Sequence, residues 1–117
     1  MLKKEYRLSK DNDFKKFNQT KKAVYSPILI MKFLENQMPI SRFGLIVSTK
    51  VSKKANKRNL IRRRLNEILR LNLVKIKKGY DILIIISPKV INSQGKTMAY
   101  KELEDNLLTA LRKVKLL

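Results

Sequence analysis

The stretch Lys50–Lys78 constrains the fold of this chain most, because it combines a helical apolar period with dense positive charge. It holds 12 of the 28 basic residues within 29 positions, against a single acid, Glu67. At 100° per residue, a helix over Lys54–Asn72 has one apolar face, made of Ile61, Leu65, Ile68 and Leu69. Its nearly opposite face is made of Asn59, Arg62, Arg63, Asn66 and Arg70. The pattern predicts a helix that packs on one side and meets a polyanion on the other.

Length and charge narrow the class of protein. The chain has 117 residues, of which 44% are hydrophobic, so we expect one domain over residues 1–117 that builds its own core. The net charge of +19 opposes compaction and is tolerated best when a partner neutralises it. Nucleic acid is the expected partner. An anionic membrane is the weaker alternative, because no basic helix is apolar enough on its far side to lie in a bilayer.

Several kinds of protein are excluded by what the sequence lacks. There is no cysteine, which rules out disulfides and thiolate metal sites. No apolar run reaches 18 residues, and the basic segment Met1–Lys10 has no apolar stretch behind it, so we expect neither a membrane span nor a signal peptide. The default expectation is a soluble, cytoplasmic protein without a small-molecule substrate.

Unaided catalysis is not expected from this chain. It has no histidine, the side chain that most often transfers protons near neutral pH. Its nine carboxylates are scattered, and the one acidic cluster, Glu102, Glu104 and Asp105, fits the first turns of a helix, where anions are favoured by the helix dipole. A protein-only nuclease would have to rely on an isolated carboxylate such as Asp81. We therefore assign no catalytic residue and no metal ligand.

The hydrophobic pattern predicts an α+β single domain in the order α-β-β-β-α-β-α. Helices are expected at Lys10–Asn18, at Lys54–Asn72 and after a capping Thr97. Strands are expected at Val24–Tyr25, Ile28–Leu34, Arg42–Ser48 and Tyr80–Ser87. The second and third strands are expected to form a hairpin. The last strand is nearly all apolar, so it should be covered on both faces, and the crossover from Arg42 to Ser87 should make its two strands parallel.

The residue types on the basic face suit RNA. A guanidinium group binds phosphate oxygens through two hydrogen bonds and stacks on exposed bases. Asn59 and Asn66 could reach a 2′-hydroxyl or a base edge at the same depth. Lys50, Lys53 and Lys54 extend the positive field at the start of the helix, where the dipole favours phosphate. A helix made only for solubility usually mixes charges of both signs, and this one does not.

The run KKANKRNLIRRRLNE (Lys53–Glu67) resembles the RNR motif of the bacterial ribonuclease P protein component. The resemblance extends over nearly the whole chain. The segment YRLSKDNDF (Tyr6–Phe14) is similar to the start of the family, RFGLIVSTK (Arg42–Lys50) to the segment before the motif, and KGYDILII (Lys78–Ile85) to the strand after it. Four similar blocks in the same order are far more specific than the Arg-Asn dipeptide alone.

This resemblance implies that the chain binds a large catalytic RNA and helps it to remove the 5′ leader from precursor tRNA. The RNA would carry out the hydrolysis with Mg²⁺ that is held mainly by the RNA, and none would be bound by the protein alone. The motif implies contact with the catalytic RNA at Arg58, Asn59, Arg62 and Arg63, and the charged face adds Lys50, Lys53, Lys54, Lys57, Asn66 and Arg70. The family's leader-binding cleft maps to Phe14, Phe17, Asn18 and Lys32. The family fold also implies a mixed four-stranded sheet with a left-handed crossover.

The chain departs from the family pattern at four positions in the motif and the cleft. Leu60 and Asn66 stand where the motif is usually basic, and Arg64 adds a charge beside them. Asn18 and Lys32 stand where the cleft is usually aromatic, and Lys32 would replace stacking on a ring with a phosphate contact. A structural RNA-binding protein associated with the ribosome is the alternative that composition alone fits equally well.

Overall fold

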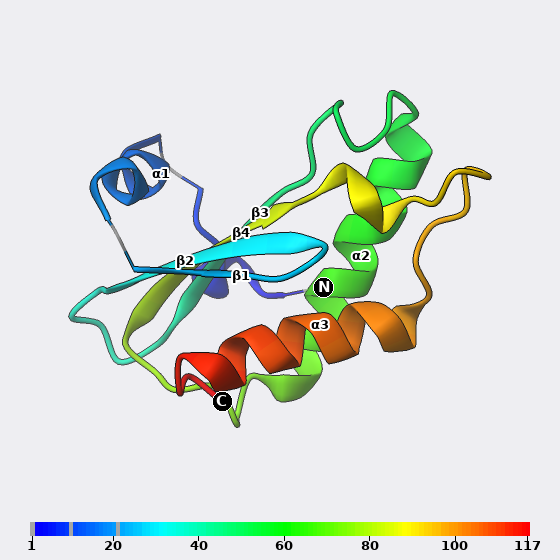
Figure 1. The fold of residues 1–117 in the computed structure, drawn as a ribbon. Helices are drawn as coiled ribbons and strands as arrows, with labels where there is room; N and C mark the ends of the chain where they lie inside the picture. The colour runs from blue at the N-terminus through cyan, green and yellow to red at the C-terminus, as the bar shows by residue number, and fades with distance from the viewer. Residues whose placement is uncertain (1, 10, 21) are drawn as a thin grey trace.

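The computed structural model describes residues 2–9, 11–20 and 22–117, and the fold within them is a four-stranded sheet with helices on both faces (Figure 1). The strands are β1 (Ala23–Tyr25), β2 (Leu29–Glu35), β3 (Arg42–Ile46) and β4 (Tyr80–Ile86). The α-helices are α1 (Asp11–Lys15), α2 (Ala55–Asn72) and α3 (Tyr100–Lys113). Short 3₁₀ turns occupy Lys4–Tyr6, Lys16–Gln19 and Pro88–Val90. The predicted order of helices and strands is confirmed.

The sheet is mixed, with strand order β1-β2-β4-β3. The apolar strand β4 lies inside the sheet, antiparallel to β2 and parallel to β3, as the crossover through α2 requires. The left-handed sense of that crossover stays a prediction from the resemblance. The expected hairpin between β2 and β3 is wrong, because β4 lies between these strands. Instead β2 forms a hairpin with β1, through a turn in which the Ser26 amide donates to the Leu29 carbonyl at 2.9 Å.

The main core lies between the sheet and the two long helices (Figure 1). Alternate residues of each strand face this core, such as Met31 in β2 and Ile82 and Ile84 in β4, and these three are fully buried. From α2, the predicted apolar face Ile61, Leu65, Ile68 and Leu69 is also fully buried. From α3, Leu103, Leu107 and Leu111 complete the core. This packing holds α2 in one orientation, so its outer side is presented in a fixed direction.

The opposite face of the sheet carries a smaller apolar cluster beneath α1. Phe17 is buried against Leu8 and Leu83, with Phe14, Leu34 and Ile85 packed around them. The helix predicted over Lys10–Asn18 is shorter than expected, since α1 continues as a 3₁₀ turn from Lys16 to Gln19. Lys10 lies outside the described residues. This cover reaches only part of the sheet, which leaves the rest of that face open.

The start of the last helix differs from the prediction. α3 begins at Tyr100 with Ala99 at its N-cap, and the alanine side chain cannot form a capping hydrogen bond. Thr97, the expected cap, instead forms an isolated bridge with Ile91, which closes the loop after β4. Residues 91–97 therefore fold as a separate turn before the helix begins.

Candidate nucleic-acid interface

The outer side of α2 and the loop before it form a continuous basic surface. We define this basic surface by its exposed or half-exposed polar members Lys50, Lys53, Lys54, Arg58, Asn59, Arg62 and Arg63. The loop is ordered by its own hydrogen bonds, since the Val51 amide donates to the Ser48 carbonyl at 3.0 Å and the Val51 side chain is buried. Lys50, Lys53 and Lys54 remain exposed around it. The first turn of α2 contains no acidic residue, and its N-cap residue Lys54 forms no capping hydrogen bond through its side chain, so within the described residues neither device compensates the positive dipole end.

Two guanidinium groups are positioned by neutral acceptors. Arg58 donates to the Ser52 carbonyl at 2.9 Å, and Arg62 donates to the Val47 carbonyl at 3.2 Å and to the Asn59 side-chain oxygen at 2.8 Å. Carbonyl and amide oxygens orient the guanidinium groups without neutralising them. Each group therefore keeps its full positive charge and has further donors for a phosphate.

A hollow of about 460 Å³ lies on the outer side of α2, lined by Asn56, Asn59, Arg62, Arg63 and Asn66. Arg63 is exposed and forms no ion pair within the described part of the chain. Asn59 and Asn66 do not lie at the same depth, because Asn59 is exposed whereas Asn66 is only 8% exposed. Asn66 is thus a recessed polar group, reachable only by a group that enters the hollow.

Three further basic residues of α2 are arranged differently. Arg70 pairs with Glu67 at 2.5 Å on the helix surface, and this guanidinium lowers the pKa of the Glu67 carboxyl. Lys57 and Arg64 lie on the flank nearer α3, where they donate to the carbonyls of Gly95 and Met98 respectively. Arg70 is therefore partly neutralised, and Lys57 and Arg64 extend the positive charge towards the loop before α3 rather than along the Arg58–Arg62 flank.

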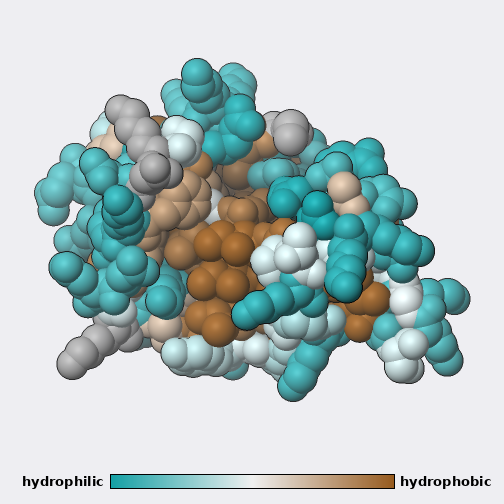
Figure 2. Space-filling view, turned by 90° about the horizontal axis from the view of Figure 1, so that it is seen from above, coloured by the Kyte–Doolittle hydropathy of each residue, from teal (hydrophilic) through white to brown (hydrophobic). Residues whose placement is uncertain are grey.

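The open face of the sheet adjoins this surface. Figure 2 shows a hydrophobic stretch in the middle of this face with hydrophilic side chains on both sides. A hollow of about 440 Å³ lies along it, lined by Ile30, Ser48, Lys50, Ile85, Ile86, Ser87 and Pro88. We call this open face, with α1 along its other side, the sheet cleft. Lys50 borders both the sheet cleft and the basic surface, so the two are continuous.

The predicted cleft residues have different exposures. Phe17 is 1% exposed and belongs to the small core, whereas Asn18 is exposed and Phe14 and Lys32 are half-buried. Phe14 lies over Gly44 of β3, where an added Cβ would stand 2.9 Å from the Phe14 ring. Glycine at this position therefore makes room for the ring. Lys32 lies on the same face of β2 as Ile30 and Leu34, two residues away on either side, and so it points into the sheet cleft.

A buried ionic cluster closes one end of the sheet cleft. Asp81 is fully buried and accepts two hydrogen bonds from Arg42, at 2.9 and 2.7 Å, one from Asn36 at 2.9 Å, and one from Lys16. Burial alone would raise the pKa of Asp81, but these hydrogen bonds outweigh it and hold the pKa below its ordinary value. Arg42 also reaches Asp13 at 3.4 Å, which ties α1 to the sheet.

The Asp81 cluster determines whether this carboxylate could act as a general base or as a metal ligand. The oxygens of Asp81 are occupied by donors, two of which are cationic, so the group is a poor general base and a poor metal ligand. Among residues 2–9, 11–20 and 22–117, no three His, Cys, Asp or Glu side chains are grouped to hold a metal ion.

The described helices include none long and apolar enough to cross a membrane.

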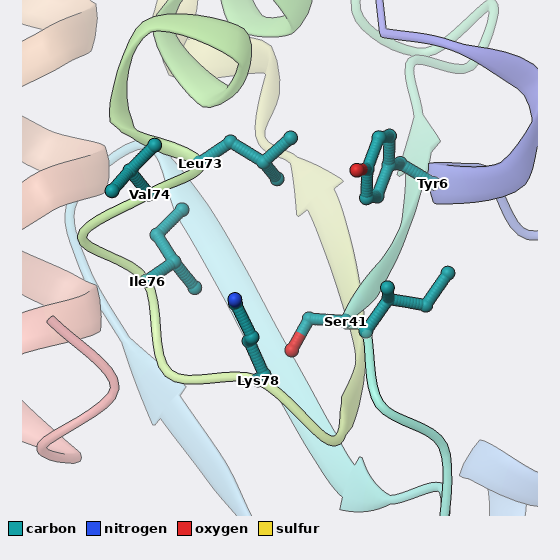
Figure 3. Close-up of a pocket in the computed structure, with 7 residues that line it drawn as sticks. Tyr6, Ser41, Leu73, Val74, Ile76 and Lys78 are labelled. Atoms are coloured by element: carbon teal, nitrogen blue, oxygen red, sulfur yellow. The ribbon is translucent and has the colours of Figure 1, made fainter.

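A separate hollow of about 170 Å³ lies near the C-terminal end of α2 (Figure 3). Tyr6, Ser41, Leu73, Val74, Ile76 and Lys78 surround it from different parts of the chain. The Ser41 hydroxyl donates to the Lys77 carbonyl at 2.7 Å and accepts from the Tyr80 amide at 3.1 Å. The Ser41 hydroxyl thus holds two loops together and is not positioned as an activated nucleophile.

A basic helix beside an open, partly apolar sheet face is typical of RNA-binding proteins. Comparison with known proteins makes the class specific, since residues 2–115 match the family model described as Ribonuclease P. A ribonuclease P protein component from Alkaliphilus oremlandii (strain OhILAs) is 37% identical over 111 residues, which cover 95% of this chain and 92% of the relative. One from Clostridioides difficile (strain 630) is 35% identical over 107 residues, covering 91% and 89%. The chain belongs to the ribonuclease P protein family.

Solved structures agree with this assignment. The ribonuclease P protein from Thermotoga maritima has a TM-score of 0.81 and 30% identity, covering 92% of this chain and 96% of that one. A mutant ribonuclease P protein from Staphylococcus aureus has a TM-score of 0.85, covering 97% of this chain and 92% of that one. Its 23% identity shows likeness in fold alone.

Sequence reasoning missed two features of this region. The four-group cluster around Asp81 joins residues 65 positions apart, and only the strand pairing of β3 with β4 brings Arg42 opposite Asp81. Tyr25 was assigned to a strand, but its place on the open face of the sheet was not recognised. The alternation of Ala23 and Tyr25 against Val24 was the available signal, although it gave no indication of which strand would pair with β1.

Proposed function

We propose that this chain is the protein subunit of ribonuclease P that binds the catalytic RNA through the basic surface and the 5′ leader of precursor tRNA in the sheet cleft. In this proposal it assists Mg²⁺-dependent endonucleolytic removal of the leader, in the cytoplasm where tRNA precursors are made. The family membership supports the role of subunit. The assignment of the two RNA molecules to two surfaces rests on the geometry of the described residues.

One observation carries the proposal for the catalytic RNA. Arg58 and Arg62 are oriented by carbonyl oxygens of Ser52 and Val47, so their positive charges are fixed in place but not neutralised. Ion pairing with a phosphate then needs little further ordering of the side chain, which lowers the entropic cost of binding. Arg63 lies beside them, and no ion pair joins it to any other described residue. A folded RNA can therefore meet three guanidinium groups along one helix.

The shape of the sheet cleft supports single-stranded RNA there. An extended strand of RNA exposes flat bases and a charged backbone, and it binds best to apolar or aromatic platforms with basic side chains nearby. The sheet cleft has an apolar floor at Ile30 and Ile85, with Lys32 and Lys50 beside it. The bases of a double helix are stacked on one another, so they could not lie flat on this floor.

The chemistry in this proposal belongs to the RNA partner. The described carboxylates do not fit a Mg²⁺ site, because no three of them are grouped and the buried one, Asp81, is occupied by Arg42, Lys16 and Asn36. Mg²⁺ binds through carboxylates and phosphate oxygens, and phosphate is what the catalytic RNA supplies. The protein's contribution is to position the two RNAs and to screen the repulsion between their phosphates.

Reconstitution tests the proposal. The purified chain, mixed with a bacterial ribonuclease P RNA, should restore 5′ leader cleavage at a Mg²⁺ concentration at which that RNA alone is inactive. The same RNA with an equal amount of the Arg62→Ala, Arg63→Ala double variant should regain much less activity. No stimulation by the wild-type protein with RNAs from several bacteria would contradict the proposal.

A further inference from the structure

Tyr25 is the most unusual side chain on the open face of the sheet. It is 68% exposed, and it is the only one of the eight aromatic residues, all of which are described, that falls in the exposed class. It lies on the edge strand β1 and pairs with Ile30 of β2. A large exposed ring at this place contributes little to packing, so its role is better sought outside the protein.

The register places Tyr25 at one end of a row that crosses the whole sheet. Ile30 pairs with Tyr25 on one side and with Ile85 on the other, and Ile85 pairs with Ile46 of β3. Ile46 is 36% exposed, and Ile30 and Ile85 line the hollow of the sheet cleft. The row is therefore apolar along its length and remains uncovered at both ends.

The neighbouring row supplies the charge. Lys32 pairs with Ala23, two residues before Tyr25, so Lys32 and Tyr25 are diagonal neighbours on the same face of the sheet. Side chains in this relation stand roughly 7–8 Å apart at their Cα atoms, within reach of one ligand. An aromatic ring with a cation beside it can bind a nucleotide, because the base stacks on the ring while the phosphate forms an ion pair with the cation.

We propose that Tyr25 stacks on a base of the single-stranded 5′ leader, while Lys32 binds a phosphate of the same stretch of chain. This inference rests on the proposed function, because it assumes that the leader lies in the sheet cleft. The occupant is single-stranded RNA rather than a protein, since the cleft is bordered by Lys32 and Lys50 in a chain of net charge +19. Lys32 itself offers no ring, so Tyr25 supplies the aromatic contact from the neighbouring strand.

Tyr25 and Phe14 would then bind different parts of the leader. Phe14 lies over Gly44 of β3, and the register runs from Gly44 through Leu83 and Lys32 to β1. The two rings are thus separated by three strand spacings, roughly 14 Å. This distance exceeds one stacked base, so removing each ring should affect a different leader nucleotide.

The test compares precursor tRNAs that carry a leader of several nucleotides or of one nucleotide, bound to the reconstituted holoenzyme in Ca²⁺ to prevent cleavage. Tyr25→Leu keeps an apolar side chain but removes the ring, and Tyr25→Phe keeps the ring. We expect Tyr25→Leu to weaken binding of the long-leader substrate at least fivefold, because stacking on one base is lost. Tyr25→Phe should bind like wild type, and binding of the one-nucleotide substrate should not change.

A leader with a single abasic position gives an independent measurement. Scanning that position should find one nucleotide whose base matters to the wild type and no longer matters to Tyr25→Leu. Val74→Ala, 93% exposed near the end of α2, is the matched control and should behave like wild type. Circular dichroism melting of each variant establishes that it folds, and Tyr25→Val, a good strand former, replaces Tyr25→Leu if that variant does not.

Three results would overturn the inference. If wild type gains affinity from the long leader and Tyr25→Leu keeps that gain, Tyr25 does not bind the leader, whereas the proposed function stands. If the variant loses affinity equally for both substrates, Tyr25 acts on the fold or on the catalytic RNA. If wild type itself gains nothing from the longer leader, leader binding in the sheet cleft is wrong, and the inference fails with it.

Discussion

Asp81 and Arg42 form a two-pronged ion pair between adjacent parallel strands, with Nε–Oδ1 and Nη2–Oδ2 distances of 2.9 and 2.7 Å. Asp81 is fully buried, and Lys16, from the 3₁₀ turn after α1, forms a second ion pair with it. The pair therefore joins the sheet to the segment that carries Phe14 and Phe17. In the proposed function, stability and leader binding are therefore connected through this ion pair.

Arg42→Ala should destabilise the protein by about 3 kcal/mol, since it leaves a buried carboxylate with Lys16 and Asn36 as its remaining partners among the described residues. Chemical denaturation followed by circular dichroism measures this change in the free energy of unfolding. Glu67→Ala is the matched control, because it breaks the exposed pair with Arg70 and should leave the denaturation midpoint nearly unchanged. Equal effects of the two variants would contradict the structural role of the Asp81 cluster.

The pH dependence of stability follows from the lowered pKa of Asp81. A carboxyl whose pKa is lower in the folded state contributes stability above its unfolded pKa, close to the ordinary value of 3.8, and loses it as the pH falls through the folded pKa. We expect this contribution to be constant from about pH 5 to 8 and to decline below about pH 4. In Asp81→Asn the decline should be shallower. An unchanged acid profile in that variant would contradict the assignment.

Arg62→Ala should weaken binding of the catalytic RNA by about 1–3 kcal/mol without lowering the free energy of unfolding. The reason is that its guanidinium is held at the surface by the Val47 carbonyl and the Asn59 side chain rather than in the core. Filter binding and thermal melting provide the two readouts. Arg112→Ala, which removes an exposed arginine in the last turn of α3, is the control for charge alone and should bind nearly like wild type.

Leu65→Asp should unfold the domain instead, since Leu65 is fully buried.

Salt should weaken binding steeply. If about six phosphates are neutralised, affinity for the catalytic RNA should fall roughly a thousandfold between 50 and 200 mM monovalent salt. Arg62→Ala should reduce the slope of log affinity against log salt by about one. A flat profile for the wild type would reject the electrostatic account of the basic surface.

Gly44→Ala tests the position of Phe14. The added Cβ would stand 2.9 Å from the Phe14 ring and 3.1 Å and 3.2 Å from the Leu8 and Leu83 side chains. Overpacking of this kind costs about 1–3 kcal/mol and should displace the ring from the sheet cleft. Leader-dependent affinity for precursor tRNA should therefore fall, while binding of the catalytic RNA stays near wild type. A variant that keeps the whole leader contribution would show that the ring is not part of that site.

Local sequence patterns predicted the elements of this fold better than their arrangement. The helix over Lys54–Asn72 was predicted almost to the residue, because its apolar positions follow the helical period, and all four predicted apolar residues are fully buried. The hairpin between β2 and β3 was a wrong inference from neighbours in sequence. No local sequence signal indicates that β2 pairs with β1 and β4, because this pairing depends on the burial of β4 on both faces of the sheet.

The candidate site was predictable to the same extent. Arg58, Asn59, Arg62 and Arg63 were expected on one side of a helix, and the structure places them on the outer side of α2 and on one flank of it. Their hydrogen bonds to Ser52 and Val47 were not foreseeable, because they depend on how the preceding loop folds back. Tyr25 could not be assigned to the sheet cleft until the register of β1 was known.

The central claim, that the outer side of α2 lies against the catalytic RNA, can be tested by tethered cleavage. The chain has no cysteine, so Asn56→Cys and Thr109→Cys each create one attachment point for an iron chelate that generates hydroxyl radicals. Asn56 is exposed beside the arginines of α2, and Thr109 is exposed on α3. In the reconstituted complex, we predict strong, localised cuts in the catalytic RNA from position 56 and few or none from position 109. Cuts from position 109 but not from position 56 would contradict the account.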